Sequence, residues 1–66
     1  MKLYNLLEKI DESQTVIITD GAGLELSRYD GKNSIDPQLL NNSVLRVYAF
    51  NDDNGAAVLC IQIYDN

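Results

Sequence analysis

Two pairs of short strand-like runs, each pair separated by a glycine-containing turn, constrain this chain more than any other feature. All five residues of Thr15–Thr19 are branched at Cβ, which favours extended backbone. Residues 24–29 alternate, with Leu24 and Leu26 on one side of the run. The intervening Asp20–Gly23 turn contains two glycines, which permit a tight reversal. These residues predict a first β-hairpin.

A second hairpin is predicted nearer the C-terminus. Residues 44–50 read VLRVYAF and residues 56–64 read AAVLCIQIY, two apolar runs of strand length. The segment between them ends in Asn54-Gly55, a pair that favours hairpin turns.

One helical segment precedes each hairpin. Residues 2–11 place Leu3, Leu6, Leu7 and Ile10 on one stripe, which predicts an amphipathic helix. Residues 35–41 predict about one turn of helix. Asp36 is suited to the N-cap and Pro37 to the first helical position, where its missing N–H costs nothing.

The elements together predict a single α+β domain spanning residues 1–66. We expect a four-stranded antiparallel sheet of two hairpins, with the N-terminal helix and the short helical turn on one face, and a loop over 30–34. The core is predicted from the helical stripe and the inward strand positions: Leu3, Leu6, Leu7, Ile10, Val16, Ile18, Leu45, Val47, Leu59, Ile61 and Ile63.

The residue content excludes several kinds of site. Cys60 is the single cysteine and the chain has no histidine, so an intramolecular disulfide and a Cys/His zinc site are both excluded. Small extracellular domains usually need disulfides, so a reducing, cytoplasmic location is expected. The apolar runs are far shorter than the roughly 20 residues of a membrane-spanning helix.

Motifs that carry chemistry are incomplete. Gly21-Ala22-Gly23 begins like a dinucleotide-binding turn, but Leu26 stands where the third glycine belongs. The Asp52–Gly55 segment resembles a calcium loop, yet apolar residues occupy its two key ligand positions. Cys60 has no histidine base. We expect no enzymatic activity, no cofactor and no metal.

The second face of the predicted sheet is rich in aromatic residues. It carries Val44, Arg46, Tyr48, Phe50, Val58, Cys60, Gln62 and Tyr64, and is joined by Ile17 and Tyr29. One helix and one helical turn cannot cover both faces of a sheet. Exposed tyrosine, phenylalanine and arginine are typical of interaction surfaces, so a homodimer contact or a partner-binding face is expected. The alternative is that tyrosines only decorate an exposed sheet.

The chain carries 5 basic and 10 acidic residues, a net charge of −5. Its cations are scattered singly (Lys2, Lys9, Arg28, Lys32 and Arg46), which argues against direct nucleic-acid binding. The acidity favours a basic partner, although solubility alone also accounts for it.

The layout resembles small acidic accessory proteins encoded by phages and prophages of Gram-positive bacteria. The matching stretches are KLYNLLEKID at 2–11, VIITDGAGLEL at 16–26, IDPQLL at 35–40 and the two closing strands. Asp36 is an insertion relative to that pattern. The resemblance covers nearly the whole chain and implies a phage protein acting inside a bacterium.

Two functions follow as hypotheses. The first is an anti-CRISPR-like inhibitor of a host defence nuclease, whose carboxylates occupy a groove built for phosphates. Its predicted partner-binding residues are Tyr29, Arg46, Tyr48, Phe50, Val58 and Tyr64, with the acids Glu25, Asp30, Asp36, Asp52 and Asp53. The second is a homodimeric assembly module that associates through the open sheet face.

Overall fold

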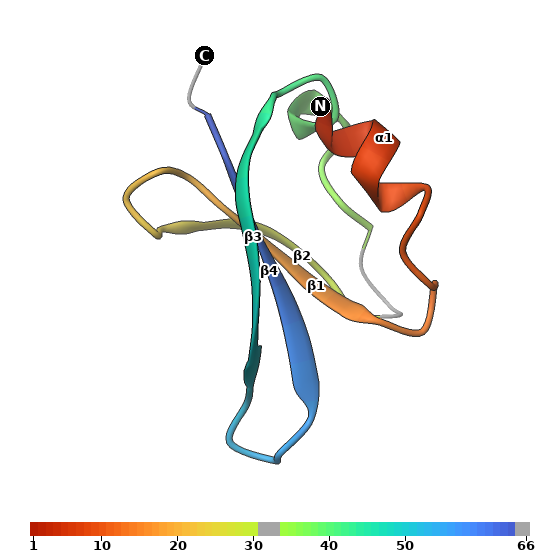
Figure 1. Cartoon of the computed structure of the whole chain (residues 1–66), viewed down its shortest axis with the longest axis vertical. Helices are drawn as coiled ribbons and strands as arrows, with labels where there is room; N and C mark the ends of the chain where they lie inside the picture. Colours follow the sequence, from red (N-terminus) through yellow and green to blue (C-terminus); the bar gives the residue numbers. More distant parts are fainter. Residues whose placement is uncertain (31–33, 65–66) are drawn as a thin grey trace.

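The computed structural model describes residues 1–30 and 34–64, so the middle of the loop predicted at 30–34 lies outside the described residues. The elements follow the predicted order along the chain (Figure 1). They are α1 (Leu3–Leu7), β1 (Thr15–Thr19), β2 (Glu25–Tyr29), the 3-10 turn η1 (Pro37–Leu39), β3 (Val44–Asn51) and β4 (Ala57–Ile63).

The four strands form one mixed sheet in the order β2-β1-β4-β3. Both predicted hairpins are confirmed, but the fully antiparallel sheet is wrong, because β1 and β4 pair in parallel. β2 and β3 therefore lie at opposite edges of the sheet, although they follow each other in the chain. This order puts the two most apolar strands in the centre, as expected for strands that are covered on both faces.

The two hairpin turns are built in the same way. Asp20 Oδ1 accepts hydrogen bonds from the backbone N–H groups of Ala22 and Leu24, at 2.9 and 3.0 Å. Asp52 Oδ1 likewise accepts from the N–H groups of Asn54 and Ala56, both at 2.9 Å. Gly23 and Gly55 occupy the same place in each turn, with φ of 90° and 81°, a conformation that glycine adopts most readily.

The predicted N-terminal helix is shorter than 2–11, since regular α-helix ends at Leu7. Its start is held by backbone bonds from Leu3 N–H to the Asn42 carbonyl (2.9 Å) and from Tyr4 N–H to the Leu40 carbonyl (3.0 Å). Tighter turn bonds continue to Ile10, whose N–H donates to the Leu7 carbonyl. The apolar stripe therefore persists beyond the regular helix.

The η1 turn confirms the predicted cap. Asp36 Oδ1 accepts a hydrogen bond from Gln38 N–H at 3.0 Å, and Pro37 occupies the first helical position. The Asp36 N–H donates to Ser27 Oγ at 3.0 Å, which ties this turn to β2. No helix in the part of the chain that the structure describes has the length and apolarity to span a membrane.

The core lies between the sheet and the helical segments. Leu3, Val16, Ile18, Ile61 and Ile63 form its buried centre, as predicted. The remaining predicted members that pack against this centre are partly buried: Leu6, Leu7, Ile10 and Leu59.

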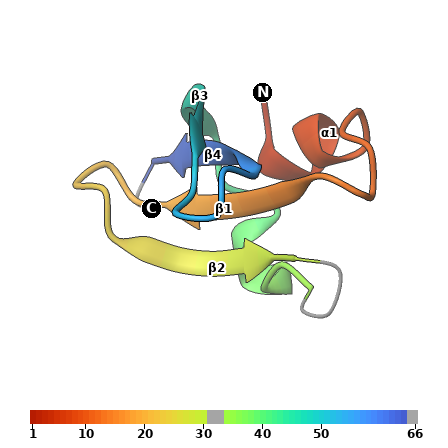
Figure 2. The ribbon, with the colours of Figure 1, turned by 90° about the horizontal axis from the view of Figure 1, so that it is seen from below.

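Two core predictions on β3 are wrong. A bulge between Val44 and Arg46 shifts the register, so Val44 and not Leu45 packs against the core. Val47 is 43% exposed. Figures 1 and 2 give the reason: α1 and η1 lie on one side of the molecule, whereas most of β3 and its turn project away from them.

Candidate interaction surface

The sheet face opposite the core, called here the open face, is organised in rows across the strands. One row runs from Arg28 on β2 through Ile17 and Cys60 to Tyr48 on β3, and Val58 pairs with Phe50 in the next row. The centre of this face is already buried: Val58 is 3% exposed and Cys60 is 1% exposed. The prediction that Val58 is available to a partner is therefore wrong.

Exposure on the open face concentrates on β3. Tyr48 is 44% exposed and Phe50 is 42% exposed, and their ring centroids lie 6.5 Å apart with a tilt of 38°. We call these two residues the aromatic pair. Arg46 lies on the same face in the neighbouring position, opposite Gln62, and is also exposed. The structure thus brings three predicted contact residues together on one edge strand.

The aromatic pair rests on the buried centre of the open face. Interaction of the Tyr48 hydroxyl with the Cys60 thiol raises the pKa of Tyr48, and the negative charge of a Cys60 thiolate acts in the same direction. On its other side, the Cys60 Sγ lies 3.9 Å from the Thr19 Oγ1. Tyr48 therefore lies against Cys60 of the neighbouring strand, and part of its side chain remains exposed.

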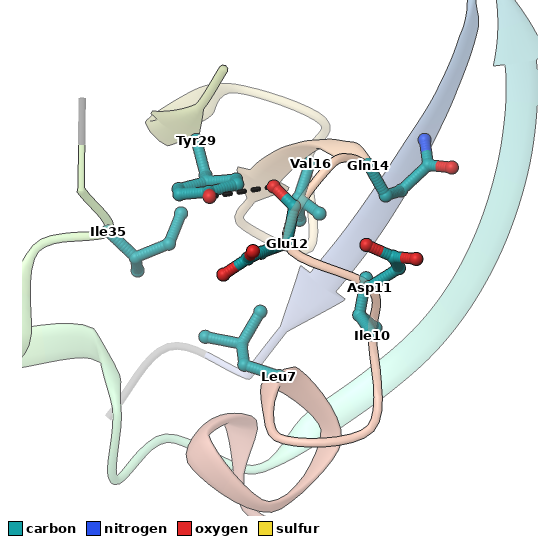
Figure 3. Close-up of a pocket in the computed structure, with 8 residues that line it drawn as sticks. All are labelled: Leu7, Ile10, Asp11, Glu12, Gln14, Val16, Tyr29 and Ile35. Carbon is teal, nitrogen blue, oxygen red and sulfur yellow. Dashed lines mark hydrogen bonds between the residues drawn. The ribbon is translucent and has the colours of Figure 1, made fainter. Parts of the chain in front are cut away.

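The other two predicted aromatic contacts lie elsewhere. Tyr29 pairs with Val16 on the core face, and its hydroxyl donates to the Glu12 carbonyl at 2.7 Å (Figure 3), so its assignment to the open face is wrong. Tyr64 follows the end of β4, where its N–H donates to the Ser43 carbonyl at 3.0 Å. That is the end of β4 away from Val58 and the aromatic pair.

Three of the five acidic residues predicted to contact a partner interact electrostatically with Arg28. Glu25 forms an ion pair with Arg28, with 3.0 Å between Glu25 Oε1 and Arg28 Nη2. Glu25 is the main cause that raises the pKa of Arg28, and the charges of Asp30 and Asp52 add to it. Asp52 directly follows β3, so the β3–β4 turn begins at the end of the strand that carries the aromatic pair.

The remaining two acids differ in their environments. Asp36 caps η1 and contacts β2 through its backbone, so its carboxylate already has a structural partner. Asp53 is exposed in the β3–β4 turn, next to Asp52. An acidic turn therefore adjoins the aromatic pair, and Asp36 is separate from it.

A small cleft of about 190 Å³ opens on the core side, where α1, β1 and β2 meet (Figure 3). Its lining residues are Leu7, Ile10, Asp11, Glu12, Gln14, Val16, Tyr29 and Ile35. Ligand sites for small molecules usually measure about 300 to 1,000 Å³. The hydrogen bond from Tyr29 to Glu12 spans its rim, so we interpret the cleft as a gap in packing.

Sequence reasoning missed how much of β3 is exposed. Val47 and Ala49 point to the core face but lie beyond the helical cover, so both faces of the strand are open from residue 46 onward. A signal was present, because β1 and β4 contain no charged residue, as central strands usually do not, whereas β3 carries Arg46. That contrast would have placed β3 at an edge.

Comparison of the chain with protein-family models, curated proteins and solved structures finds no match.

Proposed function

We propose that this chain is an acidic, non-enzymatic interaction protein that binds a basic protein partner through the aromatic pair and the adjoining β3–β4 turn. The observation that carries the proposal is the joint exposure of Tyr48 and Phe50 on a hairpin strand. Following the resemblance to phage accessory proteins, the partner we favour is a nucleic-acid-binding protein of the host, such as a defence nuclease.

The aromatic pair has the properties of an interface anchor. Aromatic side chains dominate binding energy when a partner covers them, and arginine is enriched beside them. Both rings are already half-buried against their own sheet, so binding orders few additional side-chain torsions. Covering the exposed remainder removes apolar area from water, worth about 25 cal/mol per Å².

The charge pattern favours a basic partner. The net charge is −5, and Asp52 and Asp53 stand at the end of the strand that carries the aromatic pair. The cation on the far side of this face, Arg28, is already paired with Glu25. Such a surface steers a positively charged partner during encounter, and salt weakens that steering.

The test is capture of partners from a bacterial host lysate at low and high salt, with Tyr48→Asp as the test variant. Tyr4→Asp is the matched control, because Tyr4 is 41% exposed but lies on α1. We expect wild type and Tyr4→Asp to retain a basic nucleic-acid-binding protein at low salt only, and Tyr48→Asp to lose it. Equal capture by the two variants would contradict the proposal.

The alternative function, self-association through the open face as an assembly module, predicts a different outcome. Burial of aromatic surface is nearly independent of salt, so the association would persist at high salt. Sedimentation velocity of the purified chain tests the alternative, because it requires a dimer held through the open face that Tyr48→Asp or Phe50→Asp dissolves.

A further inference from the structure

The two edge strands of the sheet, β2 and β3, differ in how well they are protected against pairing with another chain. The β2 edge has five residues, a bulge and the ion pair of Glu25 with Arg28, and Ser27 is bonded to the backbone of Asp36. The β3 edge runs for eight residues, and Arg46 carries its single formal charge. Among the described residues, its outer side is paired only at the start, where the Val44 N–H donates to the Met1 carbonyl (2.8 Å) beside the Lys2–Ser43 bridge, and no strand pairs with the rest. Long, apolar edges of this kind are templates for pairing with another chain.

Side chains on both faces of β3 are exposed, which also favours this strand as the edge that pairs with another chain. Val47 on the core face and the aromatic pair on the open face are exposed to nearly the same fraction, between 42% and 44%. A new strand beside β3 would contact side chains on both faces and satisfy the free backbone groups. Edge pairing therefore uses surface that a partner on the open face alone would leave uncovered.

We infer that a second copy of this chain pairs with β3 edge to edge, in antiparallel orientation, to give a continuous eight-stranded sheet. A two-fold axis normal to the sheet is the symmetry that closes such a pair. That axis keeps the open faces of both copies on the same side. It also requires one residue of β3 to lie opposite its own copy, which limits the register to a few alternatives.

Charge complementarity selects among these registers. With Ala49 opposite itself, Tyr48 faces the second copy's Phe50, and Arg46 faces the second copy's Asp52. Both aromatic pairs then meet across the junction, and each arginine opposes a carboxylate, two favourable kinds of cross-strand pair. With Tyr48 on the axis, Arg46 instead faces the second copy's Phe50, and Asp52 faces the apolar Val44. We therefore place the axis at Ala49.

The inference goes beyond the proposed function, because it concerns the backbone edge of β3 and a different partner, a second copy of the chain. The dimer would join two aromatic pairs into one larger patch on the shared open face. A partner bound there would contact both copies.

Cysteine cross-linking tests the register. Directly opposite Cβ atoms in antiparallel strands lie about 4.5 to 5.5 Å apart, close to the separation that a disulfide needs. Under oxidised glutathione, Ala49→Cys should form a covalent dimer by itself. Val47→Cys and Asn51→Cys should link only when the two variants are mixed. Wild type is the control, because Cys60 is buried. A covalent dimer of Val47→Cys alone would overturn the register.

Sedimentation equilibrium tests the dimer itself. Ala49→Lys places two like charges opposite each other at the axis, so we expect the dissociation constant of the dimer to rise at least tenfold. Leu26→Lys is the matched control on the β2 edge and should leave the dissociation constant of the dimer unchanged. Circular dichroism checks that both variants fold. A wild-type monomer at millimolar concentration, or an unchanged Ala49→Lys dimer, would overturn the inference.

The two proposals fail separately in these assays. Ala49 lies on the face opposite the aromatic pair, so folded Ala49→Lys should still capture the basic partner from lysate even as a monomer. Tyr48→Asp removes that capture by altering the open face.

Discussion

The two hairpins of this small protein share one turn chemistry but have different surroundings. Asp20 and Asp52 accept the same pair of backbone hydrogen bonds, and Gly23 and Gly55 adopt the same backbone conformation. The outer strand of the first hairpin, β2, is held by contacts with residues near η1, whereas the outer strand of the second, β3, extends beyond the helical cover. The comparison shows that local sequence forms the turn, while position relative to the helices determines which strand stays exposed.

The largest expected effect is a difference in unfolding free energy between substitutions on the covered strand β4 and on the uncovered strand β3. Ile61→Ala removes a fully buried side chain from the core centre and should lower the free energy of unfolding by about 2–4 kcal/mol. Val47→Ala, directly opposite Ile61 on β3, should cost less than about 1 kcal/mol because Val47 is largely exposed. Urea denaturation measures both. Similar losses at the two positions would show that β3 is covered after all.

The second prediction tests whether the two turns are equivalent. Asp20→Ala and Asp52→Ala each remove an acceptor of two backbone hydrogen bonds, and each should cost about 1–2 kcal/mol. The asparagine variants retain an acceptor oxygen and should recover most of that loss. Thermal and urea unfolding of the four variants give the comparison. If only one of the two alanine variants is destabilised, the turns are not equivalent.

A third, somewhat smaller effect on stability comes from the backbone conformation of the two turn glycines. Gly23 and Gly55 have positive φ, and a Cβ at either position would meet no atom within 4 Å. Replacement by alanine therefore adds backbone strain without a steric clash, so each variant should lose about 1 kcal/mol of unfolding free energy. A loss of several kcal/mol in either variant would reveal a contact that the structure does not contain.

The smallest effect is a pH dependence of stability from the contact between Tyr48 on β3 and Cys60 on β4. Folding raises the pKa of Tyr48, mainly through the Cys60 thiol. A group whose pKa rises on folding holds its proton more tightly in the native state, so its stabilisation is present below the unfolded pKa near 10 and is lost as the pH rises through the folded value. Ultraviolet titration should show Cys60→Ala shifting the Tyr48 transition back towards pH 10. An unchanged transition would contradict the contact.

Local features of the fold were accessible from sequence because their causes are local. The β-branched run of β1, the cap formed by Asp36 and Pro37, and the buried stripe position of Leu3 each depend on neighbouring residues. Both hairpins were predicted for the same reason. The parallel pairing of β1 with β4 depends on how two hairpins dock, and no short-range pattern in this chain specifies it.

The candidate surface was predictable only in part. The aromatic pair and Arg46 followed from the alternation of VLRVYAF along β3. The burial of Val58 and Cys60 did not, because it depends on the side chains that flank them on the two paired strands, β1 and β3. Tyr29 was misplaced because strand alternation alone does not tell which face of β2 joins the core.

The central claim, that β3 and not β2 carries the interaction surface, is tested most directly by amide chemical-shift mapping. Isotope-labelled protein would be titrated with the partner captured from lysate, and shifts of β2 and β3 would be compared. We predict the largest changes at residues 46–53, with β2 and α1 nearly unaffected. Changes concentrated at residues 25–29 or on α1, with β3 unaltered, would contradict the account.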